Sequence, residues 1–173
     1  MLSSIAALPH RRSAWAVLAA SAFILVAVAL YFQYQMDLEP CVKCIYQRVA
    51  VLAIGLVALV PLIAPTSVIA RLIGFAGWLV AAGWGYLIAA EHSAMQQAAN
   101  AFFSVCDSVP AFPGFMPLHE WFPGLFAARG LCGDINWEFI GLSMPEWMQI
   151  IFASYFVAAI LVLLCRLLRV RKP

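Results

Sequence analysis

Four long runs of apolar residues divide the chain. They cover residues 14–32, 44–64, 72–90 and 147–165, and the only charged residue inside them is Arg48, near the start of the second run. A helix needs about 20 predominantly apolar residues to cross a bilayer. The pattern therefore predicts an all-α integral membrane protein in which residues 1–173 form a single domain, a four-helix transmembrane bundle.

The first run has a second interpretation, a cleaved signal peptide. Basic residues precede it, and Ala27-Val28-Ala29 offers a small-residue cleavage site. The apolar run continues beyond that site to Phe32, and we therefore expect an uncleaved span.

Composition narrows the class of protein. Hydrophobic residues make up 65% of the chain and charged residues 10%, whereas a soluble domain is about half apolar and a quarter charged. This excludes a soluble globule, a disordered tail and a nucleic-acid-binding module, and the length leaves no room for a separate soluble catalytic domain. Any chemistry must therefore lie in the membrane helices and their loops.

The basic residues predict the orientation. With four spans, both termini share one side with the loop at 64–71, and that side carries seven of the ten Lys and Arg residues: Arg11, Arg12, Arg71, Arg166, Arg169, Arg171 and Lys172. The positive-inside rule places this side, and both termini, in the cytoplasm. All eight acidic residues fall on the opposite side, in loops at about 33–43 and 91–146. The second loop is rich in aromatic residues, and its segment at about 116–128 is expected to form a short helix on the membrane surface.

Five cysteines carry the candidate chemistry. Cys41, Cys44, Cys106 and Cys132 fall on the non-cytoplasmic side, and Cys165 ends the fourth span on the other side. Disulfides persist outside the cytoplasm and are rare within it. We therefore expect two disulfides outside and one buried or interfacial free thiol at Cys165.

Cys41 and Cys44 form a CxxC motif at the start of the second span. The helix dipole and the cations Lys43 and Arg48 favour the thiolate, which is the reactive form. A disulfide across so small a loop removes little chain entropy, so a redox-active pair is a better interpretation than a structural one. Arg48 lies one turn after Cys44 on the same helix face. It is either part of the functional site, as an intramembrane charge is by default, or a residue that extends to the interface and anchors the helix.

Cys106 and Cys132, 26 positions apart, also have two interpretations. They form a structural disulfide, or a second redox couple that exchanges with a partner and then with the CxxC pair. A zinc site is disfavoured because a zinc ribbon needs a second closely spaced cysteine pair, and we expect no metal. His92, beside Glu91 at the end of the third span, is a weaker candidate because it leaves the membrane on the same side as Arg48.

Several short motifs accompany the cysteines along the chain. They are Pro40-Cys41-Val42-Lys43-Cys44-Ile45-Tyr46-Gln47-Arg48, Glu91-His92, Cys106-Asp107, Gly133-Asp134, Trp137-Glu138-Phe139 and Met144-Pro145. Together they closely resemble the bacterial disulfide bond formation protein B family, over nearly the whole chain and with the same span count and topology.

The resemblance implies a multi-pass protein of the bacterial inner membrane with its active cysteines on the periplasmic side. Such a protein is a thiol:quinone oxidoreductase. It reoxidises a periplasmic thioredoxin-fold dithiol oxidase of the DsbA type and passes the electrons to the membrane quinone pool, ubiquinone or menaquinone. That family context includes the role of keeping the bacterial periplasm oxidising.

The resemblance also implies roles for single residues. Cys106–Cys132 would be the loop disulfide, Cys106 would form the mixed disulfide with the partner, and the electrons would pass on to Cys41–Cys44. Cys44 would form a charge-transfer contact with bound ubiquinone, and Arg48 would help to hold it. We place His92 with these two residues in the expected quinone site.

Two other functions stay open. A non-enzymatic membrane subunit would use its disulfides only to brace its loops, and a paralogue would serve a specialised partner. A small transporter is disfavoured, because no ionisable residue lies at mid-membrane in any predicted span.

Overall fold

The computed structural model describes residues 7–97 and 106–170. Within these ranges four helices are long and apolar enough to cross a membrane, which confirms the predicted four-helix bundle. They are α2 (Arg12–Gln35), α3 (Val42–Ile63), α4 (Val68–Gln97) and α7 (Met144–Val170), and a short 3-10 helix, η1 (Leu8–His10), precedes them. The helices extend beyond the predicted apolar runs, because polar residues at the ends continue the helical turns.

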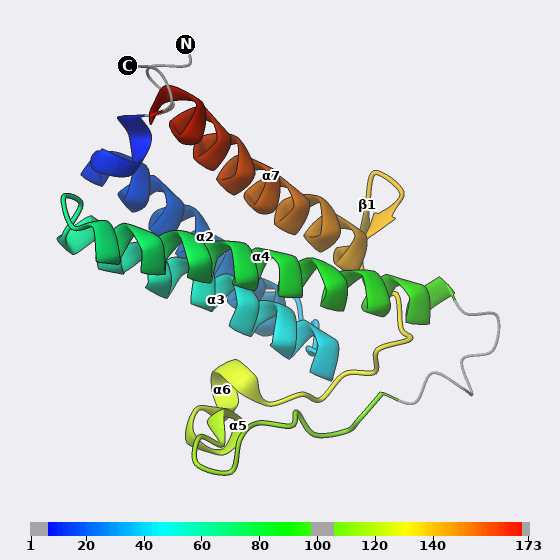
Figure 1. The fold of residues 1–173 in the computed structure, drawn as a ribbon. Coiled ribbons are helices and arrows are strands. Elements are labelled where there is room, and N and C mark those ends of the chain that lie inside the picture. Colours follow the sequence, from blue (N-terminus) through cyan, green and yellow to red (C-terminus); the bar gives the residue numbers. More distant parts are fainter. Residues whose placement is uncertain (1–6, 98–105, 171–173) are drawn as a thin grey trace.

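The four helices lie side by side, and η1 and the end of α7 lie at the same end of the bundle (Figure 1). We call this the terminal end, and the opposite end, where α3 begins, the cysteine end. The shared end agrees with the predicted placement of both termini on one side. Arg171 and Lys172, which contributed to that prediction, lie outside the described residues.

Small residues let the helices approach one another closely. α3 packs against both α2 and α4, and α7 packs mainly against α4. Phe152 of α7 is fully buried against Gly85 of α4, where a β-carbon would overlap the phenyl ring. Alanines at the other contacts, such as Ala22 and Ala58, are also fully buried. Close backbone approach at Gly and Ala is typical of helix packing in membranes.

The segment between α4 and α7 differs from the expected single surface helix. Two four-residue helices form there, α5 (Leu118–Trp121) and α6 (Pro123–Phe126), both beside the start of α3 (Figure 1). The break falls at Phe122, whose φ of −132° and ψ of 65° are not helical, because a residue before proline is driven out of the α region. The aromatic side chains of Phe115, Trp121 and Phe122 are exposed, as a membrane-lying segment would require.

A short antiparallel hairpin is an addition to the predicted all-α fold. It pairs β1 (Glu138–Phe139) with β2 (Leu142–Ser143) just before α7. Its two-residue turn, Ile140-Gly141, has positive φ at both positions, as in the turns that match strand twist. Residues 98–105 of the predicted long loop lie outside the described residues.

Candidate redox site

Cys41 and Cys44 occupy the first turn of α3. Cys41 caps the helix, and its Sγ accepts a hydrogen bond from the backbone N–H of Cys44 at 3.3 Å. The two Sγ atoms lie 3.1 Å apart, and both cysteines are free thiols. Only one of the two expected disulfides is therefore present among the described residues. As residues, Cys41 is buried and Cys44 is half-buried.

His92 reaches this dithiol from α4. Its ring is buried, with Nε2 3.5 Å from Cys41 Sγ and Nδ1 3.2 Å from Nε2 of Gln47. In the tautomer that lets Gln47 donate to Nδ1, the Nε2–H group faces the Cys41 sulfur. His92 can therefore hold a proton beside Cys41. The prediction from sequence did not include Gln47, although a polar residue between Cys44 and Arg48 in an apolar run was an available signal.

The surroundings of Cys41 favour its thiolate. Its pKa is lowered from 9.0 to about 5, chiefly by the hydrogen bond from the Cys44 thiol, while burial opposes the shift and the contact with His92 assists it. Lys43 was expected to assist as well. Instead its Nζ lies 2.5 Å from a carboxylate oxygen of Glu91, so the ammonium forms an ion pair with that carboxylate.

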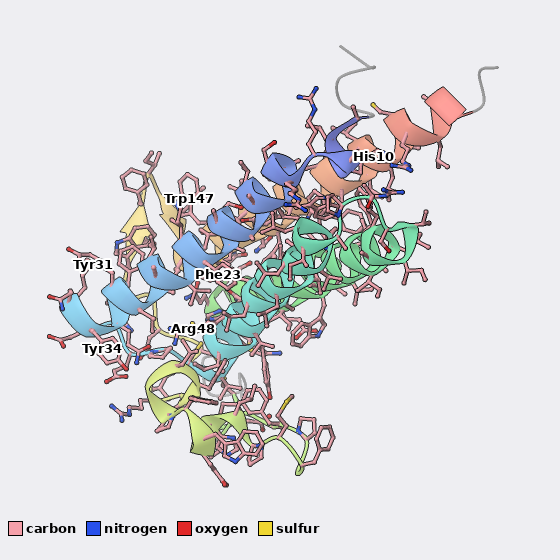
Figure 2. The ribbon with its side chains drawn as sticks, turned by 90° about the vertical axis from the view of Figure 1, so that its left-hand side faces the viewer. His10, Phe23, Tyr31, Tyr34, Arg48 and Trp147 are labelled. Carbon is pink, nitrogen blue, oxygen red and sulfur yellow. A yellow bond between two sulfur atoms is a disulfide. The ribbon has the colours of Figure 1, made fainter. Side chains whose placement is uncertain are left out.

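Arg48 lies one turn below the dithiol, and its side chain does not extend to water. The residue is only 6% exposed. Its Nη1 donates to Gln33 Oε1 at 3.0 Å and to the carbonyl oxygen of Leu125, in α6, at 2.5 Å. In Figure 2 Arg48 lies between α3 and the short loop helices. Its Nε–H has no hydrogen-bond partner among the residues that the structure describes.

A cavity of about 120 Å³ adjoins these residues. Cys41, Cys44, Gln47, Arg48 and His92 form part of its wall, and α2 and α7 add apolar side chains. The loops contribute both apolar and polar residues, among them Glu39, Asp134 and Asn136. The structure thus brings together the four helix residues proposed from the sequence and adds Gln47. A cavity of about 150 Å³ is known to accept benzene, so this volume suits a single six-membered ring.

The loop cysteines are bonded to each other as Cys106–Cys132. Cys132 is buried and Cys106 is half-buried. Two residues before Cys132, the backbone docks onto the start of α3. The N–H groups of Arg129 and Gly130 donate to the Pro40 carbonyl at 2.9 and 3.0 Å. A β-carbon at Gly130 would overlap the carbonyl oxygen of Glu39, so glycine is required for this close approach.

Cys41, Cys44 and His92 could also hold a metal ion. Their ligand atoms all lie within 4.8 Å of one another, and sulfur with imidazole nitrogen is a ligand set that zinc accepts. The expectation of no metal stays a prediction.

A transmembrane helical bundle with a dithiol at the start of one span, and a second cysteine pair in a loop docked onto it, defines a membrane thiol–disulfide redox protein. The sequence profile of disulfide bond formation protein DsbB matches residues 11–162, and the chain belongs to this family. This confirms the resemblance seen in the sequence and supports a role in disulfide bond formation.

Relatives named disulfide bond formation protein B are similar over almost their whole length. The protein from Idiomarina loihiensis is 47% identical over 165 residues, which are 95% of this chain and 91% of the relative. The protein from Pseudoalteromonas atlantica is 48% identical over 96% of this chain and 97% of the relative. The protein from Pseudoalteromonas translucida is 44% identical over 97% and 98%.

Proposed function

We propose that this protein is a thiol:quinone oxidoreductase that reoxidises a periplasmic thioredoxin-fold dithiol oxidase of the DsbA type and delivers the electrons to membrane ubiquinone. The observation that carries the proposal is the Cys41–Cys44 dithiol in the wall of a ring-sized cavity, beside a buried arginine with an unused donor. Menaquinone has the same ring carbonyls and is the second acceptor to test.

The first exchange takes place at the loop disulfide. A thiolate of the partner attacks Cys106, the less buried residue of the pair, and Cys132 leaves as a thiolate. The second thiol of the partner then attacks the mixed disulfide, which releases the oxidised partner and a reduced Cys106–Cys132 pair. Two electrons and two protons have then left the partner.

The second exchange passes these electrons to the helix pair. Cys132 attacks Cys41 in a Cys41–Cys44 disulfide, Cys44 leaves, and Cys106 then displaces Cys41 to re-form the loop disulfide. The docking of Gly130 on Pro40 supports Cys41 as the point of attack, because it fixes the chain next to Cys132 against the residue before Cys41. A loop disulfide with a helix dithiol, the state of the structure, is the product of this exchange.

The helix dithiol is the electron donor to quinone, a substrate that takes up two electrons and two protons and leaves as quinol. Cys44 and Arg48 share one helix face in the cavity wall, and the unpaired Nε–H of Arg48 is a donor suited to a quinone carbonyl. His92, held by Gln47, receives or returns the proton of Cys41. The transfer of two electrons and two protons to the quinone restores the Cys41–Cys44 disulfide.

The placement in the cell follows from charge. The terminal end carries most of the basic residues and none of the acidic ones, which supports a cytoplasmic location for that end. The cysteine end then faces the periplasm, where the partner oxidase works and disulfides persist.

The test is quinone reduction by the purified full-length protein in detergent, driven by the reduced partner oxidase and followed by ultraviolet absorbance. We expect turnover that disappears in Cys44→Ala and in Cys106→Ala, and that persists in the control Cys165→Ala. With dithiothreitol as donor, Cys106→Ala should still reduce quinone through Cys41 and Cys44. Absence of turnover with all four cysteines disulfide-bonded would instead indicate a non-enzymatic subunit, and turnover with a different thioredoxin-fold donor alone would indicate a specialised paralogue.

A further inference from the structure

A second cavity, of about 300 Å³, lies at the terminal end, away from the redox site. It is formed by η1, α2, α4 and α7, and its lining is almost entirely apolar, including Leu8, Trp15, Leu18, Phe75, Trp78 and Val162. Across it α7 reaches α2 through a hydrogen bond from Tyr155 Oη to Ser21 Oγ of 2.9 Å. This volume is in the range of pockets that bind small ligands.

Three basic side chains, His10, Arg71 and Arg166, meet one another next to residues that line this cavity. Arg71 precedes Phe75 by four residues and Arg166 follows Val162 by four, so each continues a cavity-lining helix face by one turn. Arg71 Nη1 lies 3.2 Å from Nδ1 of His10, and Arg166 Nη1 lies 3.0 Å from Nε2 of the same ring. Figure 2 shows His10 where the start of α2 meets the last turns of α7.

Among the described residues, no anionic group pairs with this cluster. A neutral imidazole has one acceptor nitrogen, so it can accept from only one of the two guanidinium groups. The pKa of His10 is lowered, first by burial and then by Arg71 and Arg166. No acidic residue occurs in residues 1–36, 40–90 or 147–173 of the sequence. Arg71 is nevertheless buried, and within residues 7–97 and 106–170 its one further hydrogen bond is to the Pro65 carbonyl, at 2.6 Å.

Deeper in the cavity wall, Trp78 has an unused hydrogen-bond donor. The residue is 8% exposed, and its indole N–H finds no acceptor in the described part of the chain. The neighbouring Trp15 by contrast donates to the Pro9 carbonyl at 3.0 Å. Trp78 lies seven residues after Arg71, which corresponds to about 10 Å along the helix. A ligand that pairs with the basic cluster and also accepts from Trp78 must therefore carry a negative charge and, about 10 Å from it, an uncharged acceptor.

We propose that the terminal end of the bundle is a binding site for one anionic glycerophospholipid. Its phosphate lies among His10, Arg71 and Arg166, a glycerol ester carbonyl accepts from Trp78, and an acyl chain fills the apolar cavity. Basic pockets between transmembrane helices on the cytoplasmic side commonly hold anionic lipid headgroups. Free phosphate would leave both the Trp78 donor and the cavity unused. The bound lipid would bridge α2, α4 and α7 and neutralise the repulsion between the arginines.

The test is thermal unfolding of the delipidated full-length protein in detergent, with phosphatidylglycerol, phosphatidylcholine or inorganic phosphate added. We expect phosphatidylglycerol alone to raise the melting temperature with saturation, and native mass spectrometry to retain one such lipid. Arg166→Gln, which alters the less buried arginine, should weaken the apparent affinity at least tenfold. Arg129→Gln at the cysteine end, an exposed arginine paired with Glu39, is the matched control and should bind like the wild type.

A second variant tests the site without altering its charge. Trp78→Phe keeps the ring in the wall and removes the unpaired N–H, so the delipidated variant should melt higher than the wild type and gain less from phosphatidylglycerol. An equal effect of phosphatidylcholine, or of inorganic phosphate, would overturn the proposal, as would identical lipid binding by Arg166→Gln and Arg129→Gln. None of these measurements depends on thiol or quinone chemistry.

Discussion

Arg48→Lys tests how the buried guanidinium contributes to the proposed quinone site. The substitution keeps the positive charge on the same helix face as Cys44. A lysine ammonium can replace one of the contacts with Gln33 and Leu125, but it cannot place a donor where the unpaired Nε–H of Arg48 lies. The variant therefore removes one specific donor and leaves the electrostatics of the site largely in place.

The expected size of the effect follows from that single donor. A hydrogen bond from a charged group contributes about 1.5–3 kcal/mol, which corresponds to a roughly 10- to 150-fold change in an equilibrium constant. We expect the KM for quinone to rise by a factor in this range, while turnover at saturating quinone changes little. Arg48→Met should have a larger effect, because it also removes the charge and the contact with α6.

The assay is steady-state quinone reduction with the quinone concentration varied and the reduced partner in excess. Arg129→Lys is the matched control, since that exposed side chain pairs only with Glu39 among the described residues, 3.6 Å away. Equal KM values for Arg48→Lys and Arg129→Lys would refute the reasoning and leave Arg48 as a residue that only fastens α6 to the bundle.

Four further predictions concern the loop, the thiolate, the bundle and metal binding. Gly130→Ala should slow reduction of the helix pair by the loop pair in quenched thiol-trapping experiments, because the added β-carbon meets the Glu39 carbonyl; Gly114→Ala, with open space around it, should not. His92→Ala should raise the thiolate titration midpoint of Cys41 above about 5 when absorbance near 240 nm is followed. Because that pKa lies below its unfolded value of 9.0, the unfolding free energy of the reduced protein should increase as pH rises between the two values. In His92→Ala this increase should be smaller. Gly85→Ala should lower the unfolding free energy by about 1–3 kcal/mol through overpacking on Phe152, whereas Gly83→Ala, in ordinary contact distance of Phe156, should not. Treatment with a chelator should leave quinone turnover unchanged, and a loss of turnover restored by zinc would show that Cys41, Cys44 and His92 hold a metal.

Much of the architecture could be predicted from the sequence, because a bilayer imposes length and polarity on each span. The same logic identified the start of α3, since a CxxC motif at the start of an apolar run falls at the water boundary. Arg48 could be assigned to the face of Cys44 from helical periodicity alone. These features depend on local spacing, and local spacing is visible in a sequence.

Contacts between distant segments could not be predicted in this way. The contact of His92 with Cys41 depends on the position of α4 along the axis of α3, and the docking of Gly130 on Pro40 depends on the path of the loop. The hairpin turn had no sequence signature, because a β-branched residue such as Ile140 rarely adopts positive φ. The break between α5 and α6 did have one, Pro123, but the aromatic content of the segment outweighed it in the prediction of a single helix.

The order in which the helices pack has a consequence for biogenesis. α2 packs on α3, α3 on α4, and α4 on α7, so each span finds its main neighbour in the span made just before or after it. A chain inserted from its N-terminus would therefore have a docking surface ready for every new helix. The loop between α4 and α7 also finds its docking surface already made, since the Pro40 carbonyl belongs to a segment synthesised before it. Both cysteine pairs therefore lie in segments that are made before α7, the last span of the membrane core.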